Sequence, residues 1–64
     1  MLNPVELYLL EQVATGASAK QIAHDAGLSE RAIENRMGSV RAKLGARNTT
    51  HAVVLAIKAG LIAP

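Results

Sequence analysis

The spacing of residues 22–33 strongly favours two helices that pack closely around a tight turn. Ala23, Gly27 and Ile33 stand at i, i+4 and i+10. A small residue at position 23 lets the two helices approach each other, and glycine at position 27 permits the positive φ of a tight turn. Ile33 then anchors the second helix to the core. This spacing is typical of a helix-turn-helix, which holds its second helix at the protein surface.

Helix-capping residues and glycines divide the whole chain into short helical segments. Asn3 with Glu6, and Ser18 with Gln21, have the spacing of capping boxes, and Ser29 is a third N-cap. The predicted helices, each followed by a glycine, cover about residues 4–15, 19–26, 30–44 and 49–59. We therefore predict an all-α fold, a four-helix, bundle-like domain that spans residues 1–64.

The small size of the chain makes its predicted stability marginal. A domain of 64 residues buries only about 60% of the surface that its unfolded chain exposes. The sequence contains no cysteine, which excludes disulfides and thiolate metal sites. Association with a second subunit is therefore the expected source of additional stability.

Basic residues are concentrated in one segment of the chain. Residues 31–47 carry five Lys or Arg against one Glu, a net charge of +4, whereas the remainder has a net charge of −2. A basic segment in an otherwise mildly acidic domain favours a polyanion as the partner on one side. A solvated helix face that happens to be basic is the alternative.

Five segments of the chain are similar to the motifs of one family of DNA-binding domains. They are LNPVE (2–6), GASAKQIA (16–23), LSERAI (28–33), RAKLGARNTTHAV (41–53) and AIKAGLI (56–62). The chain resembles the LuxR/GerE-type helix-turn-helix domain over nearly its full length. The resemblance implies four helices, of which the third enters the DNA major groove and the fourth forms a two-fold dimer contact.

The third predicted helix has an outward face that suits close approach to DNA. The apolar stripe of this helix consists of Ile33, Met37, Val40 and Leu44. The opposite face carries Arg31, Glu34, Asn35, Gly38, Ser39 and Ala42. Arginine reads guanine, asparagine reads adenine, and glutamate accepts a hydrogen bond from cytosine. Glycine costs about 1 kcal/mol of helix propensity relative to alanine, which is tolerable where the backbone must come near DNA. The predicted base contacts are Arg31, Glu34, Asn35 and Gly38.

Two of these positions depart from the pattern of the family that the chain resembles. The position of Glu34 is often basic there, and that of Gly38 is often polar or basic. We therefore expect an operator sequence that differs from those of other family members. The alternative for Gly38 is a glycine that arose by drift and has no function. The predicted phosphate contacts are Lys20, Ser29, Arg41, Lys43 and Arg47, with solvated side chains as the alternative for the cations.

The fourth predicted helix is apolar on two sides. The side that is expected to pack on the core carries Val53, Val54, Ile57 and Leu61. The other side is the predicted dimer interface, with His51, Ala52, Leu55, Ala56 and Ala59. An exposed alanine-rich face without a partner is the alternative, because alanine is common on helix surfaces for its propensity alone.

Nothing in the sequence indicates a catalytic or metal site. His24 and His51 lie on different predicted helices without clustered carboxylates, so we expect no enzyme activity, no metal and no cofactor. The longest apolar run, residues 52–57, is far shorter than the ~20 residues that cross a bilayer, and the N-terminus has no signal-peptide pattern. We expect a cytoplasmic protein without membrane partners, associated with the nucleoid when it is bound to DNA.

Together these patterns predict a stand-alone, homodimeric transcriptional regulator that binds a short pseudo-palindromic site in double-stranded DNA. Three alternatives stay open. Region four of sigma factors shares similar elements but normally ends after its recognition helix. A protein that heterodimerises with another LuxR-type regulator and blocks its DNA binding would suit the acidic Glu34 and the bare Gly38. A small architectural or recombination-accessory DNA binder is the third alternative.

Overall fold

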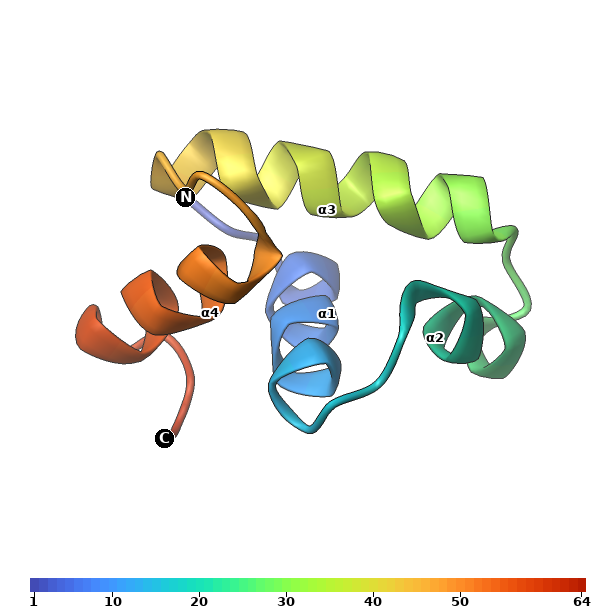
Figure 1. Ribbon diagram of the computed structural model, residues 1–64, viewed down its shortest axis with the longest axis horizontal. Coiled ribbons are helices and arrows are strands. Elements are labelled where there is room, and N and C mark those ends of the chain that lie inside the picture. Colours follow the sequence, from blue (N-terminus) through green and yellow to red (C-terminus); the bar gives the residue numbers. More distant parts are fainter.

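The computed structural model, which describes all residues from 1 to 64, contains four helices and no strand. The helices are α1 (Pro4–Ala14), α2 (Ala19–Ala26), α3 (Glu30–Leu44) and α4 (Thr49–Lys58). The predicted all-α fold is confirmed, and every helix begins and ends within one residue of its expected bounds. α3 lies across the other three helices, with α2 beneath its beginning, α4 beneath its end and α1 between them (Figure 1).

Side-chain caps begin the helices where the sequence predicts. In α1, the Asn3 side chain accepts from the Glu6 N–H at 2.8 Å, and the Glu6 carboxylate accepts from the Asn3 N–H at 2.9 Å. Ser18 and Gln21 form the same reciprocal pair at the start of α2. The Ser29 hydroxyl caps α3 by accepting a hydrogen bond from a backbone N–H one turn later. These bonds satisfy N–H groups that the first turn of a helix leaves without partners.

The connection between α2 and α3 is a tight turn around one glycine. Gly27 has a left-handed conformation with φ of 70°, which glycine adopts without steric cost. Across this turn the Leu28 N–H donates to the Ala23 carbonyl at 2.9 Å, which closes the end of α2. Ile33 then lies buried beneath α3, at 1% exposure. The structure therefore contains the helix-turn-helix that the spacing of these residues predicts.

The hydrophobic core lies beneath α3, where the four helices meet. It consists of Leu2, Leu9, Leu10, Ile22, Ala23, Ile33, Met37, Val40, Ala52, Ala56 and Ile62. Three of these side chains come from one face of α3, which matches the predicted apolar stripe of that helix. Because one face of α3 packs on the core, the opposite face of this helix is exposed to solvent.

The most deeply buried side of α4 is the one predicted to face a partner, while Val53 and Ile57 of the predicted core side also pack partly against the core. Ala52 and Ala56 are fully buried, whereas Val54 is 43% exposed. The prediction that these two alanines face a partner is therefore wrong, and so is the expectation that Val54 packs on the core. Two alanines one turn apart let α4 come close to α1 and α3, whereas larger side chains there would hold it away.

Candidate nucleic-acid interface

The outward face of α3 is not covered by any other helix. Arg31, Glu34 and Asn35 are exposed there, while Ile33 and Met37 on the opposite face are buried. Because α3 lies across the outside of the domain, this face runs along its whole length (Figure 1). An α-helix with its side chains is about 10–12 Å in diameter and so fits the major groove of B-DNA, which is about 12 Å wide.

Gly38 leaves bare backbone in the middle of this exposed face. Its φ is not positive, and a Cβ atom added to it would meet only the Arg41 Nη2 atom, at 3.6 Å. Neither a turn nor close packing therefore requires glycine at this position. The open space lies on the side of α3 that the sequence predicts to face DNA.

The Arg41 guanidinium lies beside Gly38 and is held in place there. Its Nη1 atom donates a hydrogen bond to Thr49 Oγ1 at 3.1 Å, across the connection between α3 and α4. The Arg41 side chain is half-buried and makes no ion pair. The structure thus presents a positive charge that is ordered but not neutralised next to the outward face of α3.

A buried carboxylate holds the other side of α3 to the start of α1. Glu6 is only 4% exposed and accepts hydrogen bonds from Lys43 Nζ at 2.9 Å and Ser39 Oγ at 3.3 Å. The hydrogen bond from the Lys43 ammonium, together with that from the Asn3 backbone N–H, holds the pKa of the Glu6 carboxyl below its usual value. Glu6 therefore stays ionised near neutral pH and fixes α3 in its position on the domain.

This carboxylate changes the interpretation of one predicted phosphate contact. The Lys43 ammonium is paired with Glu6, so a phosphate would have to compete with a buried anion for it. We leave Lys43 out of the proposed interface for this reason. Sequence reasoning placed Glu6 in a capping box and missed its pairing with Lys43, because the two residues lie 37 positions apart.

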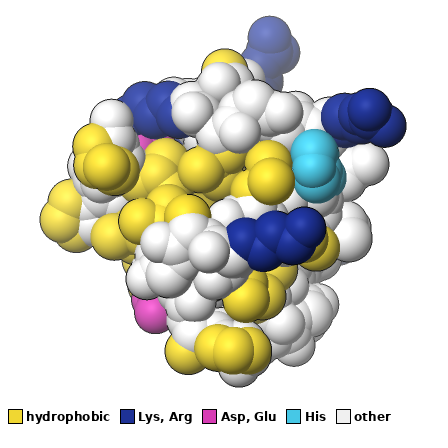
Figure 2. Space-filling model, turned by 90° about the vertical axis from the view of Figure 1, so that its left-hand side faces the viewer, with side chains coloured by type: hydrophobic (Ala, Val, Ile, Leu, Met, Phe, Trp, Pro, Cys, Tyr) yellow, Lys and Arg dark blue, Asp and Glu magenta, His cyan; other side chains and the backbone are white.

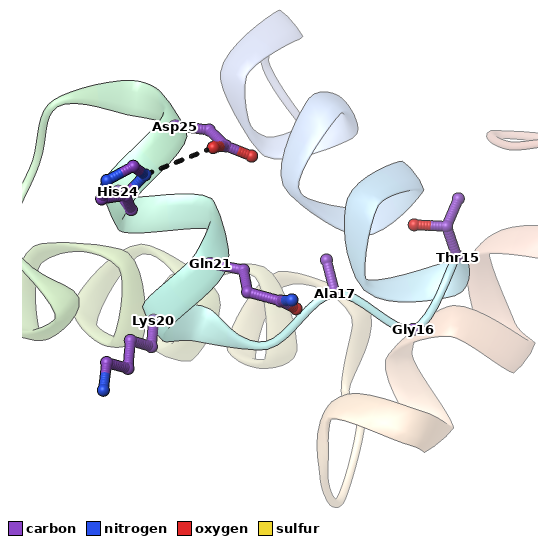
Figure 3. Close-up of a pocket in the computed structure, with 7 residues that line it drawn as sticks. All are labelled: Thr15, Gly16, Ala17, Lys20, Gln21, His24 and Asp25. Carbon is purple, nitrogen blue, oxygen red and sulfur yellow. Dashed lines mark ion pairs between the residues drawn. The ribbon is translucent and has the colours of Figure 1, made fainter.

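Lys20 projects from the first turn of α2 beside an open polar hollow (Figure 3). The hollow is lined by Thr15, Gly16, Ala17, Lys20, Gln21, His24 and Asp25. Lys20 is exposed and makes no ion pair, so its charge is available to an anion. In the hollow, His24 Nδ1 and Asp25 Oδ1 lie 3.6 Å apart and form an ion pair only when the imidazole is protonated, and a pair this exposed contributes little to stability.

The other two predicted phosphate contacts lie at the two ends of α3. The Ser29 hydroxyl oxygen accepts from the Ala32 N–H at 3.1 Å, which leaves its proton for another acceptor. Arg47 is exposed just after α3, and its backbone N–H donates to His51 Nδ1 at 3.0 Å. His51 thus helps to close the connection into α4, and it is half-buried rather than displayed on the surface.

No group of three or more His, Cys, Asp or Glu side chains is placed to hold a metal ion. No helix is both long and apolar enough to cross a lipid bilayer.

A second surface feature is an apolar patch on the outward side of α4, which we call the α4 patch. It comprises Val53, Val54, Ile57 and Leu61. Val54 is the most exposed of these, and the other three are half-buried. Figure 2 shows hydrophobic side chains gathered on this end of the molecule, with lysine and arginine side chains at the edges. Two other residues that the sequence predicts for a dimer interface lie outside this patch: Leu55 is half-buried, and Ala59 is exposed beyond the end of α4.

Comparison with known proteins agrees with this geometry. The model of the GerE family, described as bacterial regulatory proteins of the luxR family, matches residues 1–56. The chain belongs to this family. The luxR family consists of regulatory proteins rather than enzymes, and the resemblance of the sequence motifs is thereby confirmed.

Two curated relatives align with almost all of this luxR-family chain. It is 39% identical over 61 residues to the transcriptional regulatory protein YdfI of Bacillus subtilis, an alignment that covers 95% of the chain and 29% of the relative. It is 36% identical over 63 residues to the transcriptional activator protein BjaR1 of Bradyrhizobium diazoefficiens, covering 98% of the chain and 26% of the relative. The chain thus spans less than a third of either relative. No solved structure matches the chain.

Proposed function

We propose that this luxR-family chain binds specific sites in double-stranded DNA and acts as a transcriptional regulator, with α3 in the major groove. The observation that carries the proposal is the outward face of α3. This face is exposed along the helix, bare at Gly38, and lined with groups that form hydrogen bonds to base edges. The membership of the family of regulatory proteins supports the same function.

The proposed contacts divide between bases and phosphates. Arg31, Glu34 and Asn35 read base edges, and the backbone at Gly38 lets the helix axis come close to them. The proposed phosphate contacts are Lys20, Ser29 and Arg47, which lie on α2 and at the two ends of α3. Phosphate contacts of this kind set the position of the helix in the groove, and the base contacts set the sequence.

We further propose that two copies associate through the α4 patch. An apolar patch on so small a domain is a candidate for burial in a dimer, and Val54 lies at its most exposed point. A two-fold dimer presents two α3 helices to successive major-groove faces, which requires half-sites about one helical turn of DNA apart. Val54 is only 43% exposed in the monomer, so burying its remaining surface contributes about 1 kcal/mol. A side chain that goes from full exposure to full burial contributes more, about 1.5–3 kcal/mol.

The test is selection of binding sites from random duplex DNA, followed by affinity measurements against salt concentration. The proposal expects a short motif with two inverted half-sites, and affinity that falls steeply with salt. Binding that is equal for all sequences would support an architectural role instead. Absence of DNA binding, with formation of a mixed dimer with a luxR-family regulator, would support the antagonist that the acidic Glu34 suits.

A further inference from the structure

The space left by Gly38 is bordered by the guanidinium of Arg41. Side chains on a helix lean towards its N-terminus, so the Arg41 side chain reaches back by about one turn. Its Nη2 atom comes to 3.6 Å from the place where a Cβ atom of residue 38 would lie. The guanidinium therefore lies where a side chain at position 38 would leave the helix.

Thr49 holds the guanidinium at this place. The bond from Arg41 Nη1 to Thr49 Oγ1 uses one of the five N–H donors of the guanidinium. No acidic side chain pairs with Arg41, although Glu34, one turn before Gly38, lines the same pocket as Arg41 and Thr49. A group that is ordered before binding loses less conformational entropy when it meets its target.

We infer that Arg41 determines sequence specificity by reading a guanine at the position where Gly38 supplies no side chain. This inference rests on the proposed function. Guanine presents the O6 and N7 acceptors in the major groove, and the planar fork of arginine matches this pair. Gly38 lies near the middle of the outward face of α3, between Asn35 and Ala42, which is the part of the helix that enters the groove most deeply in the proposed binding mode. Arg41 thus reads a base, in place of the phosphate contact expected from the sequence.

The experiment compares the binding sites selected by the wild-type chain, Arg41→Lys, Arg41→Ala and Thr49→Val. Each variant is then titrated against the wild-type site and against versions in which every G·C pair is replaced in turn. For the wild type, replacement of one particular G·C pair is expected to lower the binding affinity about 5- to 150-fold. Arg41→Lys keeps the charge but loses the planar fork, so discrimination at that position falls while the salt dependence is unchanged. Thr49→Val keeps the shape of the side chain at position 49 but removes the acceptor of the Arg41 hydrogen bond, so discrimination at the same G·C position weakens.

Arg36→Lys is the matched control, because Arg36 is exposed on α3, makes no ion pair and is not one of the proposed DNA contacts. It is expected to leave the selected motif unchanged. Circular dichroism of each variant shows that the helices are retained. Arg41→Lys with full discrimination at every G·C pair overturns the inference alone. The inference is also overturned if Arg41→Ala lowers the affinity equally for all sequences and reduces the slope of log affinity against log salt by about one, because this is the behaviour of a phosphate contact. A wild-type chain that selects no motif overturns the proposed function and this inference together.

Discussion

Replacement of Ala56 by leucine tests which side of α4 packs on the core. The Ala56 side chain has no exposed surface, so three additional carbon atoms must displace neighbours in a closely packed site. Overpacking of this kind costs about 1–3 kcal/mol. A domain of this length is expected to have a total free energy of unfolding of roughly 3–10 kcal/mol. We therefore expect Ala56→Leu to remove a substantial part of the stability of the domain.

Urea denaturation followed by circular dichroism measures this loss. For a denaturant dependence of about 1 kcal/mol/M, the midpoint is expected to fall by about 1–3 M. Val54→Leu is the matched control, because Val54 is 43% exposed and an added methylene there should change stability by less than about 0.5 kcal/mol. Both variants are compared at one low protein concentration, so that dimer formation does not add to the stability. An Ala56→Leu variant as stable as the wild type, with a destabilised Val54→Leu, would refute the assignment of the two sides.

Four further outcomes follow from the structure. Val54→Glu is expected to give a folded monomer in sedimentation experiments, whereas Ala59→Glu, with the same charge change outside the α4 patch, should leave association intact; the reverse result would contradict the proposed interface. Asn35→Ala should weaken binding to the selected site by about 1–3 kcal/mol and leave binding to random DNA nearly unchanged, and equal losses on both would exclude base reading. Lys20→Ala should lower affinity for all sequences and reduce the salt slope by about one, so an unchanged slope would place Lys20 outside the interface. The lowered pKa of Glu6 means that its stabilisation is complete above the unfolded-state pKa near 4.5 and is lost as the pH falls from there through the folded-state pKa. Urea denaturation of wild type and Glu6→Gln between neutral and acid pH should show this step only in the wild type.

Local interactions explain why the helices were predictable from the sequence. Caps such as Asn3 with Glu6, and the turn at Gly27, act over three to five residues, so their spacing is visible in the chain itself. The outward face of α3 was also predictable, because its apolar stripe at Ile33, Met37 and Val40 determines which side is buried. These local signals were sufficient for the fold class and for the family resemblance.

The orientation of α4 depended on tertiary packing. Both of its sides are apolar, so the periodicity of hydrophobic residues does not distinguish a core face from an exposed face. The close approach of the helices decides which side is buried most deeply, since the small side chains of Ala52 and Ala56 fit fully against α1 and α3, whereas Val53 and Ile57 are buried only in part. The larger Val54 was consequently left on the outside.

The side-chain pairs around α3 also depended on the tertiary structure. Lys43 meets Glu6 across 37 residues, and Arg41 meets Thr49 across the connection into α4. In the sequence, Arg41 and Lys43 are two cations of one basic segment, with nothing to tell them apart. The fold distinguishes them, because Lys43 pairs with the buried Glu6 carboxylate, while Arg41 contacts a hydroxyl and its charge has no carboxylate partner.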